Sequence, residues 1–90
     1  MKLLFPNGEH APVELESGRA LLGSASESDV VLLAPGIAPR HAEIEVDGAS
    51  AKITVIHPDN PVTVNGKAVT TSCDLKPGDL VTFAGVRARA

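Results

Sequence analysis

The apolar residues of this chain occur in short runs separated by turn residues. Each run spans three to six residues and is rich in β-branched and aliphatic side chains. A period of two is clearest at Ala42, Ile44 and Val46, which alternate with acidic residues, as in a half-buried strand. No window sustains the i, i+3, i+4, i+7 pattern of an amphipathic helix. The expected strands are 2–5, 11–15, 19–23, 29–33, 41–46, 51–56, 62–64, 67–69, 80–83 and 86–90.

Turn chemistry between these runs supports an all-β fold. Gly, Pro, Asn, Asp and Ser gather at 6–8, 16–18, 26–28, 34–36, 47–48, 58–60, 65–66 and 76–79. Asn65-Gly66 is the strongest local signal, because it supplies the two positive-φ residues of a type I′ turn and so predicts a hairpin over 62–69. About ten short strands in one open sheet would leave a face bare, so we expect a β-sandwich of two packed sheets.

Composition narrows the function classes. Ninety residues favour one domain, 1–90, and a 43% apolar content with two Phe, no Trp and no Tyr makes stacking on nucleic-acid bases improbable. The net charge of −3 also argues against a nucleic-acid partner. A single cysteine, Cys73, fits a reducing compartment and is expected to be an inert small hydrophobe rather than a reactive thiol.

Catalytic, metal and membrane motifs are absent from the sequence. The three histidines and Cys73 lack zinc-ligand spacing, so no metal or cofactor is expected. No Gly-x-Ser-x-Gly elbow and no phosphate-binding loop occur, and we expect no enzymatic activity. No run approaches the roughly 18 apolar residues of a membrane span, and the first apolar run ends too early, at Pro6, for a signal peptide.

Five segments in order resemble the forkhead-associated (FHA) family: LLG, SDVVL, IAPRHAEI, NPVTVNGKAV and LKPGDLVTF. The resemblance spans residues 3–89 and implies a sandwich of about eleven short, mostly antiparallel strands that recognises phosphothreonine peptides through loops at one end. Within it, Gly23 corresponds to the family Gly that precedes the strand at Asp29. His41 corresponds to a histidine that braces the loops, and Asn65-Gly66 to the family hairpin.

The sequence departs from that pattern where phosphate is held. Ser24 stands at the position of the phosphate-binding Arg of the family. Ala38 stands at the position of a phosphate-binding Ser. Asn60 matches the Asn that holds the ligand backbone. Gly18-Arg19 looks like the missing Gly-Arg pair but lies five residues too early for its spacing to Asp29.

The two substitutions predict a loss of phosphothreonine binding. Charge-assisted hydrogen bonds to phosphate contribute about 1.5–3 kcal/mol each, so losing two should weaken binding roughly 100-fold or more. Glu27, Asp29 and Asp59 would repel the phosphate further. Arg40 is the nearby cation that could compensate; the alternative is that it is a solvated loop charge.

The same departures resemble one branch of the family. Gly-Ser at 23–24 and Ile-Ala-Pro at 37–39, followed by His41, are similar to the N-terminal cytoplasmic domain of the type III secretion inner-membrane-ring protein. The resemblance implies a scaffold on the cytoplasmic side of the bacterial inner membrane. Its partners would be neighbouring ring subunits and cytoplasmic sorting-platform proteins. Residues 1–90 would be the N-terminal part of a longer membrane protein, anchored by a segment outside this chain.

A signalling FHA module remains as the alternative. It would recognise phosphothreonine weakly through Arg40 and Asn60, or would bind an unphosphorylated partner. Under either hypothesis the best candidate for a contact surface is the set of loop positions Ser24, Ala38, Arg40 and Asn60. The strands at 62–69 and 86–90 are further candidates, because exposed strand edges can pair with a partner, although Lys67, Arg87 and Arg89 are typical of protected edges.

Overall fold

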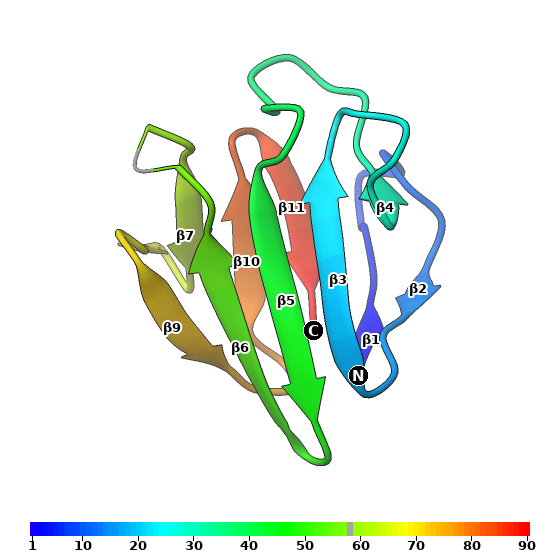
Figure 1. Ribbon diagram of the computed structural model, residues 1–90, viewed down its shortest axis with the longest axis vertical. Coiled ribbons are helices and arrows are strands. Elements are labelled where there is room, and N and C mark those ends of the chain that lie inside the picture. Colours follow the sequence, from blue (N-terminus) through cyan, green and yellow to red (C-terminus); the bar gives the residue numbers. More distant parts are fainter. Residues whose placement is uncertain (58) are drawn as a thin grey trace.

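The computed structural model describes residues 1–57 and 59–90 and contains eleven strands in two packed sheets and a short pair (Figure 1). The turn predicted at Pro58 lies outside the described residues. The predicted all-β sandwich is confirmed. The strands are β1 (Lys2–Leu3), β2 (Val13–Glu14), β3 (Gly18–Gly23), β4 (Val30–Val31), β5 (Ala42–Asp47), β6 (Ser50–Val55), β7 (Val62–Val64), β8 (Lys67–Ala68), β9 (Ser72–Leu75), β10 (Leu80–Phe83) and β11 (Val86–Arg89).

The strand order places sequence-distant segments side by side. One sheet has the order β4-β3-β5-β6-β9, and the other β11-β10-β7-β8. All pairs are antiparallel except β3–β4. The pair β1–β2 continues the second sheet, because Leu4 forms a bridge to Arg89 at the β11 edge.

The core lies between the two sheets and follows the predicted alternation. In β5 the residues Ala42, Ile44 and Val46 are buried, and their neighbours on β6 alternate in the same way. The opposite sheet contributes Val81 and Phe83, both fully buried. Each buried aliphatic or aromatic side chain of this size contributes roughly 1.5–3 kcal/mol, so the period-two pattern supplies most of the driving force for the sandwich.

Two predictions about strands are wrong. No strand was predicted at β9, where Cys73 and Leu75 face the core between exposed Ser72 and Asp74. Two inward residues in a polar segment are too weak a pattern to predict a strand; β9 forms because β6 offers a free edge. The strand predicted over 29–33 ends at Val31, and Leu33 is 81% exposed on the following loop.

The predicted hairpin over 62–69 is present and is tied to the next turn. Asn65 and Gly66 have φ values of 52° and 83°, as a type I′ turn requires. The Asn65 side chain donates from Nδ2 to Asp79 Oδ1 (3.0 Å) and accepts the Leu80 N–H (3.0 Å). Asp79 Oδ2 accepts the Lys76 N–H at 2.9 Å. The β7–β8 and β9–β10 turns are thereby held together.

These contacts predict a measurable change in one pKa. The hydrogen bond from Asn65, followed by that from the Lys76 N–H, lowers the Asp79 pKa below its ordinary value of 3.8. The stabilisation that this carboxylate provides is therefore complete above the pKa of the unfolded chain and is lost as the pH falls through the lower folded pKa. Asn65→Gly keeps the positive φ and removes the donor, so the Asp79 pKa should rise. An NMR titration of the Asp79 carboxyl carbon, with Thr63→Ala as the control hairpin variant, checks this; an unchanged pKa in Asn65→Gly contradicts the assignment.

Candidate functional site

Three loops gather at one end of the sandwich, where β3, β6 and the β4–β5 connection turn back (Figure 1). We call this region the loop end and define it by residues 24–29, 32–41, 56–57 and 59–61. The phosphate-site positions predicted from sequence, Ser24, Ala38, Arg40 and Asn60, all belong to it. Short backbone contacts join the loops to one another, so these positions are brought together by the fold rather than by sequence proximity.

Gly23 allows the first two loops to pack directly on each other. A Cβ at this position would lie 2.1 Å from the carbonyl oxygen of Pro39 and 2.7 Å from its carbonyl carbon. The next two residues donate their N–H groups across the same gap, from Ser24 to the Ala38 carbonyl (3.0 Å) and from Ala25 to the Pro39 carbonyl (3.2 Å). Residue 23 must therefore be glycine for reasons of space alone.

His41 is fully buried and joins two of the loops through its ring. The Ala38 N–H, which can only donate, points at Nδ1 at 3.1 Å, so Nδ1 is unprotonated. Nε2 then carries the hydrogen and donates it to the Pro61 carbonyl at 2.9 Å. The ring also meets Phe83 edge-on, with centroids 6.2 Å apart. One neutral tautomer thus holds both loops against the core.

Asn60 connects the third loop to the second. Its Nδ2 donates to the carbonyls of Arg40 (3.2 Å) and His41 (3.0 Å). Because the amide N–H groups are directed at the backbone, the carboxamide oxygen is the group left to face a ligand. Arg40 itself is exposed, and in the part of the chain that the structure describes no carboxylate lies within ion-pair distance of it.

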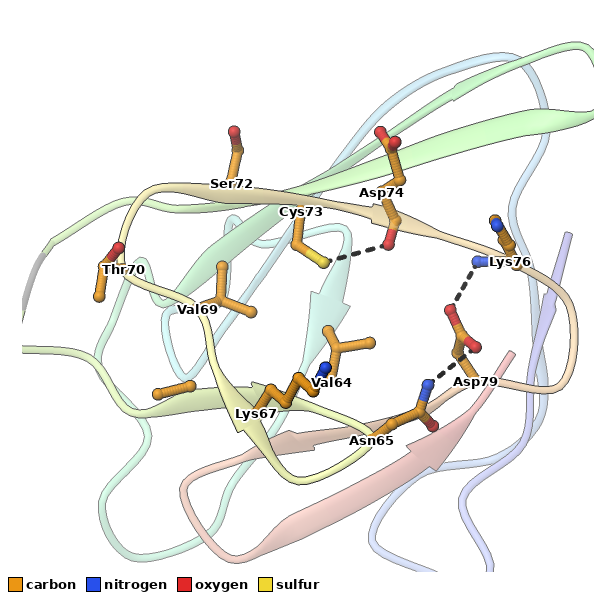
Figure 2. A pocket seen from close by; sticks show the side chains of 11 residues that line it. Val64, Asn65, Lys67, Val69, Thr70, Ser72, Cys73, Asp74, Lys76 and Asp79 are labelled. Carbon is orange, nitrogen blue, oxygen red and sulfur yellow. Dashed lines mark hydrogen bonds between the residues drawn. The ribbon is translucent and has the colours of Figure 1, made fainter.

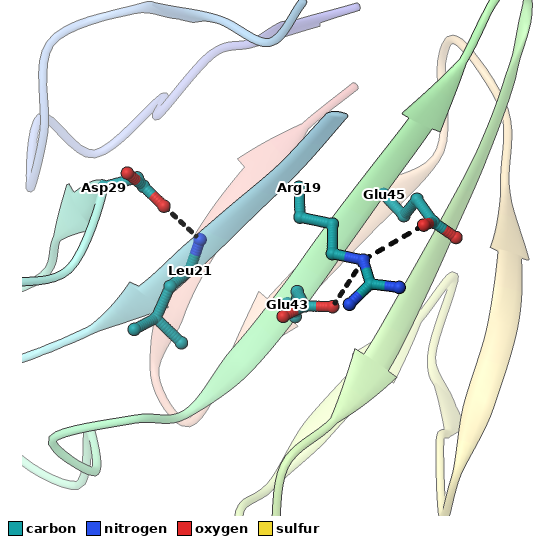
Figure 3. A network of polar contacts seen from close by, with 5 residues as sticks. All are labelled: Arg19, Leu21, Asp29, Glu43 and Glu45. Carbon is teal, nitrogen blue, oxygen red and sulfur yellow. Dashed lines mark hydrogen bonds and ion pairs between the residues drawn. The ribbon is translucent and has the colours of Figure 1, made fainter. Parts of the chain in front are cut away.

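Asp29 and Arg19 both contact residues outside the loop end. Asp29 Oδ2 accepts the Leu21 N–H at 2.8 Å and so caps the part of β3 that β4 does not cover (Figure 3). Arg19 lies on the outer face of the five-stranded sheet, with its Nε 3.1 Å from Glu45 and 3.8 Å from Glu43. The hydrogen bond with Glu45 and the charges of both carboxylates raise the Arg19 pKa. Arg19 therefore does not replace the missing loop-end arginine.

The loop end carries little positive charge. At the position of a phosphate-gripping arginine stands Ser24, and the Ala38 methyl replaces a hydroxyl. Glu27 and Asp59 are exposed on the same loops, where they oppose an anion. The sequence did not reveal that the carbonyls of Pro39 and Pro61 receive the loop hydrogen bonds; Ser28 Oγ also donates to Pro39, at 3.3 Å. Backbone acceptors leave no sequence signal.

A groove of about 520 Å³ lies away from the loop end, between the edges of β8 and β9 (Figure 2). Val64, Val69 and Cys73 contribute its apolar lining, and the Cys73 thiol donates to the Asp74 carbonyl at 3.2 Å. Lysines and aspartates both occur around it, so the groove does not select a charged ligand. Among the described residues no group of His, Cys, Asp or Glu side chains is arranged to hold a metal ion, and no helix is long and apolar enough to cross a membrane.

The sandwich, its glycine-dependent loop contact and its buried histidine define an FHA-type domain. The fold matches the FhaA FHA domain, solved with the intracellular domain of Rv3910, with a TM-score of 0.89 and 25% identity over 98% of this chain and 96% of that one. It also matches the cytoplasmic domain of the type III secretion sorting platform protein PscD from P. aeruginosa, with a TM-score of 0.83 and 28% identity over 98% of this chain and 76% of that one.

Residues 5–86 match the family described as the cytoplasmic domain of the type III secretion inner-membrane component, and the chain belongs to this family. The predicted resemblance is confirmed. A further relative is the proliferation marker protein Ki-67 of Mus musculus, 33% identical over 77 residues, which are 86% of this chain. The chain spans 2% of the length of that protein, so the similarity concerns one domain of a much longer chain.

Proposed function

We propose that this domain is a non-enzymatic protein-interaction scaffold in the type III secretion inner-membrane ring, and that its loop end does not bind phosphothreonine. Its family and its FHA fold are those of interaction modules. The proposal places residues 1–90 as one domain on the cytoplasmic side of the bacterial inner membrane, at the N-terminus of a longer membrane protein. Its partners would be neighbouring ring subunits and sorting-platform proteins; the relative PscD is itself described as a sorting platform protein.

One observation supports the proposed loss of phosphate binding. The loop end keeps the architecture, in Gly23, His41 and Asn60, but presents Ser24 and Ala38 where two phosphate donors would stand. Recognition of a phosphate rests on charge-assisted hydrogen bonds, and a methyl group can make none. The loop contacts made by Gly23, His41 and Asn60 would then serve to hold a stable protein surface.

Adding the two donors back tests this proposal. The variant with Ser24→Arg and Ala38→Ser should bind a phosphothreonine peptide more tightly than the wild type by roughly 100-fold or more, because each charge-assisted bond contributes about 1.5–3 kcal/mol. Peptide titration followed by NMR measures the affinity. Ser26→Arg adds the same charge to an exposed position of the same loop and should give a much smaller gain. A wild type that already binds as tightly as the double variant would show that the phosphate site is intact.

A second candidate function is phosphothreonine recognition through Arg40. It is favoured by the exposure of that side chain and by the fixed position of its carbonyl, which accepts from Asn60. Two exposed carboxylates on the same loops weigh against it. Arg40→Ala separates the two candidates, because only the second function requires this cation.

A further inference from the structure

The five-stranded sheet is open along most of one edge of β3. The short strand β4 pairs with β3 only at Leu22 and Gly23. The Leu21 N–H donates to Asp29, away from β5 (Figure 3). Because the direction of the backbone groups alternates along a strand, the N–H and the carbonyl of Arg19 point the same way as those of Leu21. Arg19 lies outside the two pairs with β4, so no described strand covers these two groups.

The edge of β2 is open on the same side of the sandwich. The Leu15 N–H donates to the Met1 carbonyl, and Val13 pairs with Leu3, so the backbone groups of Leu15 and Val13 face β1. Glu14 lies between them and therefore directs its N–H and carbonyl away from β1. Among the described residues no further strand pairs with this edge of β2. Only three residues, 15–17, connect it to β3.

A cleft of about 280 Å³ lies between these two edges. We call it the β2–β3 cleft; it is lined by residues 13–20, 29, 30, 44 and 46. Its apolar lining includes Leu15, Val30, Ile44 and Val46, which are all buried residues of the core. An aliphatic side chain that entered from outside would therefore meet apolar surface.

The spacing of a β-sandwich suits one added strand at this place. Stacked sheets pack about 10 Å apart, and neighbouring strands in a sheet lie about 4.7–4.9 Å apart. Two strand spacings thus equal the distance between two packed sheets. An extended segment in the β2–β3 cleft can therefore bond to both edges, with the unpaired backbone groups of Arg19 on one side and those of Glu14 on the other.

The rim of the cleft is acidic. Glu14, Glu16 and Asp29 line it together with one cation, Arg19. Arg19 is already paired with two carboxylates of β5, so it does not offset the charge of the rim. In the part of the chain that the structure describes, no cation lies within 4.0 Å of the carboxylates of Glu14 and Glu16, although Lys2 stands opposite Glu14 in the register. The rim therefore attracts a basic ligand.

We propose that the β2–β3 cleft binds a short extended segment of a partner protein in which Lys or Arg alternates with aliphatic residues. The segment adds as a strand to the free edges at Arg19 and Glu14. Because side chains alternate along a strand, its aliphatic residues enter the cleft while its cations face outward to the acidic rim. The groove between β8 and β9 carries as many lysines as aspartates and lacks this charge selection.

A capped peptide of sequence Lys-Val-Lys-Val-Lys tests the cleft in the whole chain. An NMR titration is made at about 0.1 M salt, where the Debye length is about 10 Å. Amide shifts should be confined to β2, β3 and residues 29–30, and should be largest at Glu14 and Arg19, whose free N–H groups become bonded. Shifts centred on β8 and β9, on the outer face of β5 or on the loop end overturn the proposal.

Two control peptides separate backbone pairing from charge attraction. N-methylation of both valines removes the donors that face one of the two edges and keeps the charges, so it should weaken binding about 10-fold or more. Replacing the three lysines by glutamates keeps the backbone and should abolish measurable binding. A methylated peptide that binds as tightly as its parent would show that charge alone drives the contact and would overturn strand addition.

A pair of variants tests the acidic rim. Glu14→Gln with Glu16→Gln should weaken peptide binding several-fold, because each exposed ion pair contributes little by itself. Both side chains are exposed and form no ion pair among the described residues, so the variant should fold. Glu9→Gln with Asp74→Asn removes the same charge at exposed positions that do not line the cleft. Equal weakening by the two variants would overturn the role of the rim.

This contact goes beyond the proposed scaffold function and does not involve the loop end. The peptides carry no phosphate, so none of these results bears on phosphothreonine binding. The two proposals can therefore fail independently.

Discussion

Gly23→Ala should destabilise the domain by about 3 kcal/mol or more, because core overpacking that no side chain can relieve lies at the high end of single-residue effects. The added Cβ would meet the Pro39 carbonyl oxygen at 2.1 Å, and the obstacle is backbone. Moving Pro39 away would also break the hydrogen bonds that Ser24 and Ala25 make to the next loop. Urea unfolding of the variant and of the wild type measures the loss.

Gly85→Ala is the matched control for this substitution. Gly85 lies in the β10–β11 turn, where an added Cβ would have no atom within 4 Å and the φ lies outside the left-handed range that L side chains avoid. Its effect should stay below about 1 kcal/mol. Equal losses from the two alanines would mean that the close loop contact at Gly23 is not what the fold requires.

His41→Ala should cost about 3 kcal/mol or more. It leaves a cavity beside Phe83, and large-to-small changes in a core cost about 2–5 kcal/mol. It also leaves the Ala38 N–H without its acceptor, at about 1–3 kcal/mol, whereas the Pro61 carbonyl still accepts the Ala84 N–H at 2.9 Å. Chemical unfolding gives the magnitude, and faster hydrogen exchange at Ala38 should show that the loss begins in the loops.

Two further variants separate the hydrogen bonds from the packing. His41→Phe fills the space and keeps a ring against Phe83 but removes both hydrogen bonds, so it should still lose much of the stability. His57→Ala removes a histidine whose side chain is 63% exposed and should cost less than about 1 kcal/mol. A fully stable His41→Phe would show that the ring acts by packing alone.

The strands with strict alternation could be predicted from the sequence, because burial of one face dictates the pattern. The strand Ala42–Asp47 is the clearest case. The strand at Ser72–Leu75 could not be, since only Cys73 and Leu75 mark its inner face and its partner strand lies about 20 residues earlier. At Leu33 the error is the opposite one, because a strand was predicted where none exists. The aliphatic run continues past the end of the strand into an exposed loop.

The sequence predicted which residues lie at the loop end, but it did not predict the groups that these residues contact. The family resemblance identified Gly23, His41 and Asn60. The groups that they contact are the backbone carbonyls of Pro39, Pro61 and Arg40, which any residue would supply. The adjacency of β1 and β11 was equally hidden, because Leu4 and Arg89 are paired only through the order of the strands.

The proposed function requires that the loop end does not bind phosphothreonine. The most direct measurement is an NMR titration of the wild-type chain with a degenerate phosphothreonine peptide library, against the unphosphorylated library as control. No phosphate-dependent shifts should appear near Ser24, Ala38 and Arg40 at millimolar peptide. Phosphate-dependent shifts there that Arg40→Ala abolishes would contradict the claim and identify a phosphopeptide-binding domain with a relocated cation.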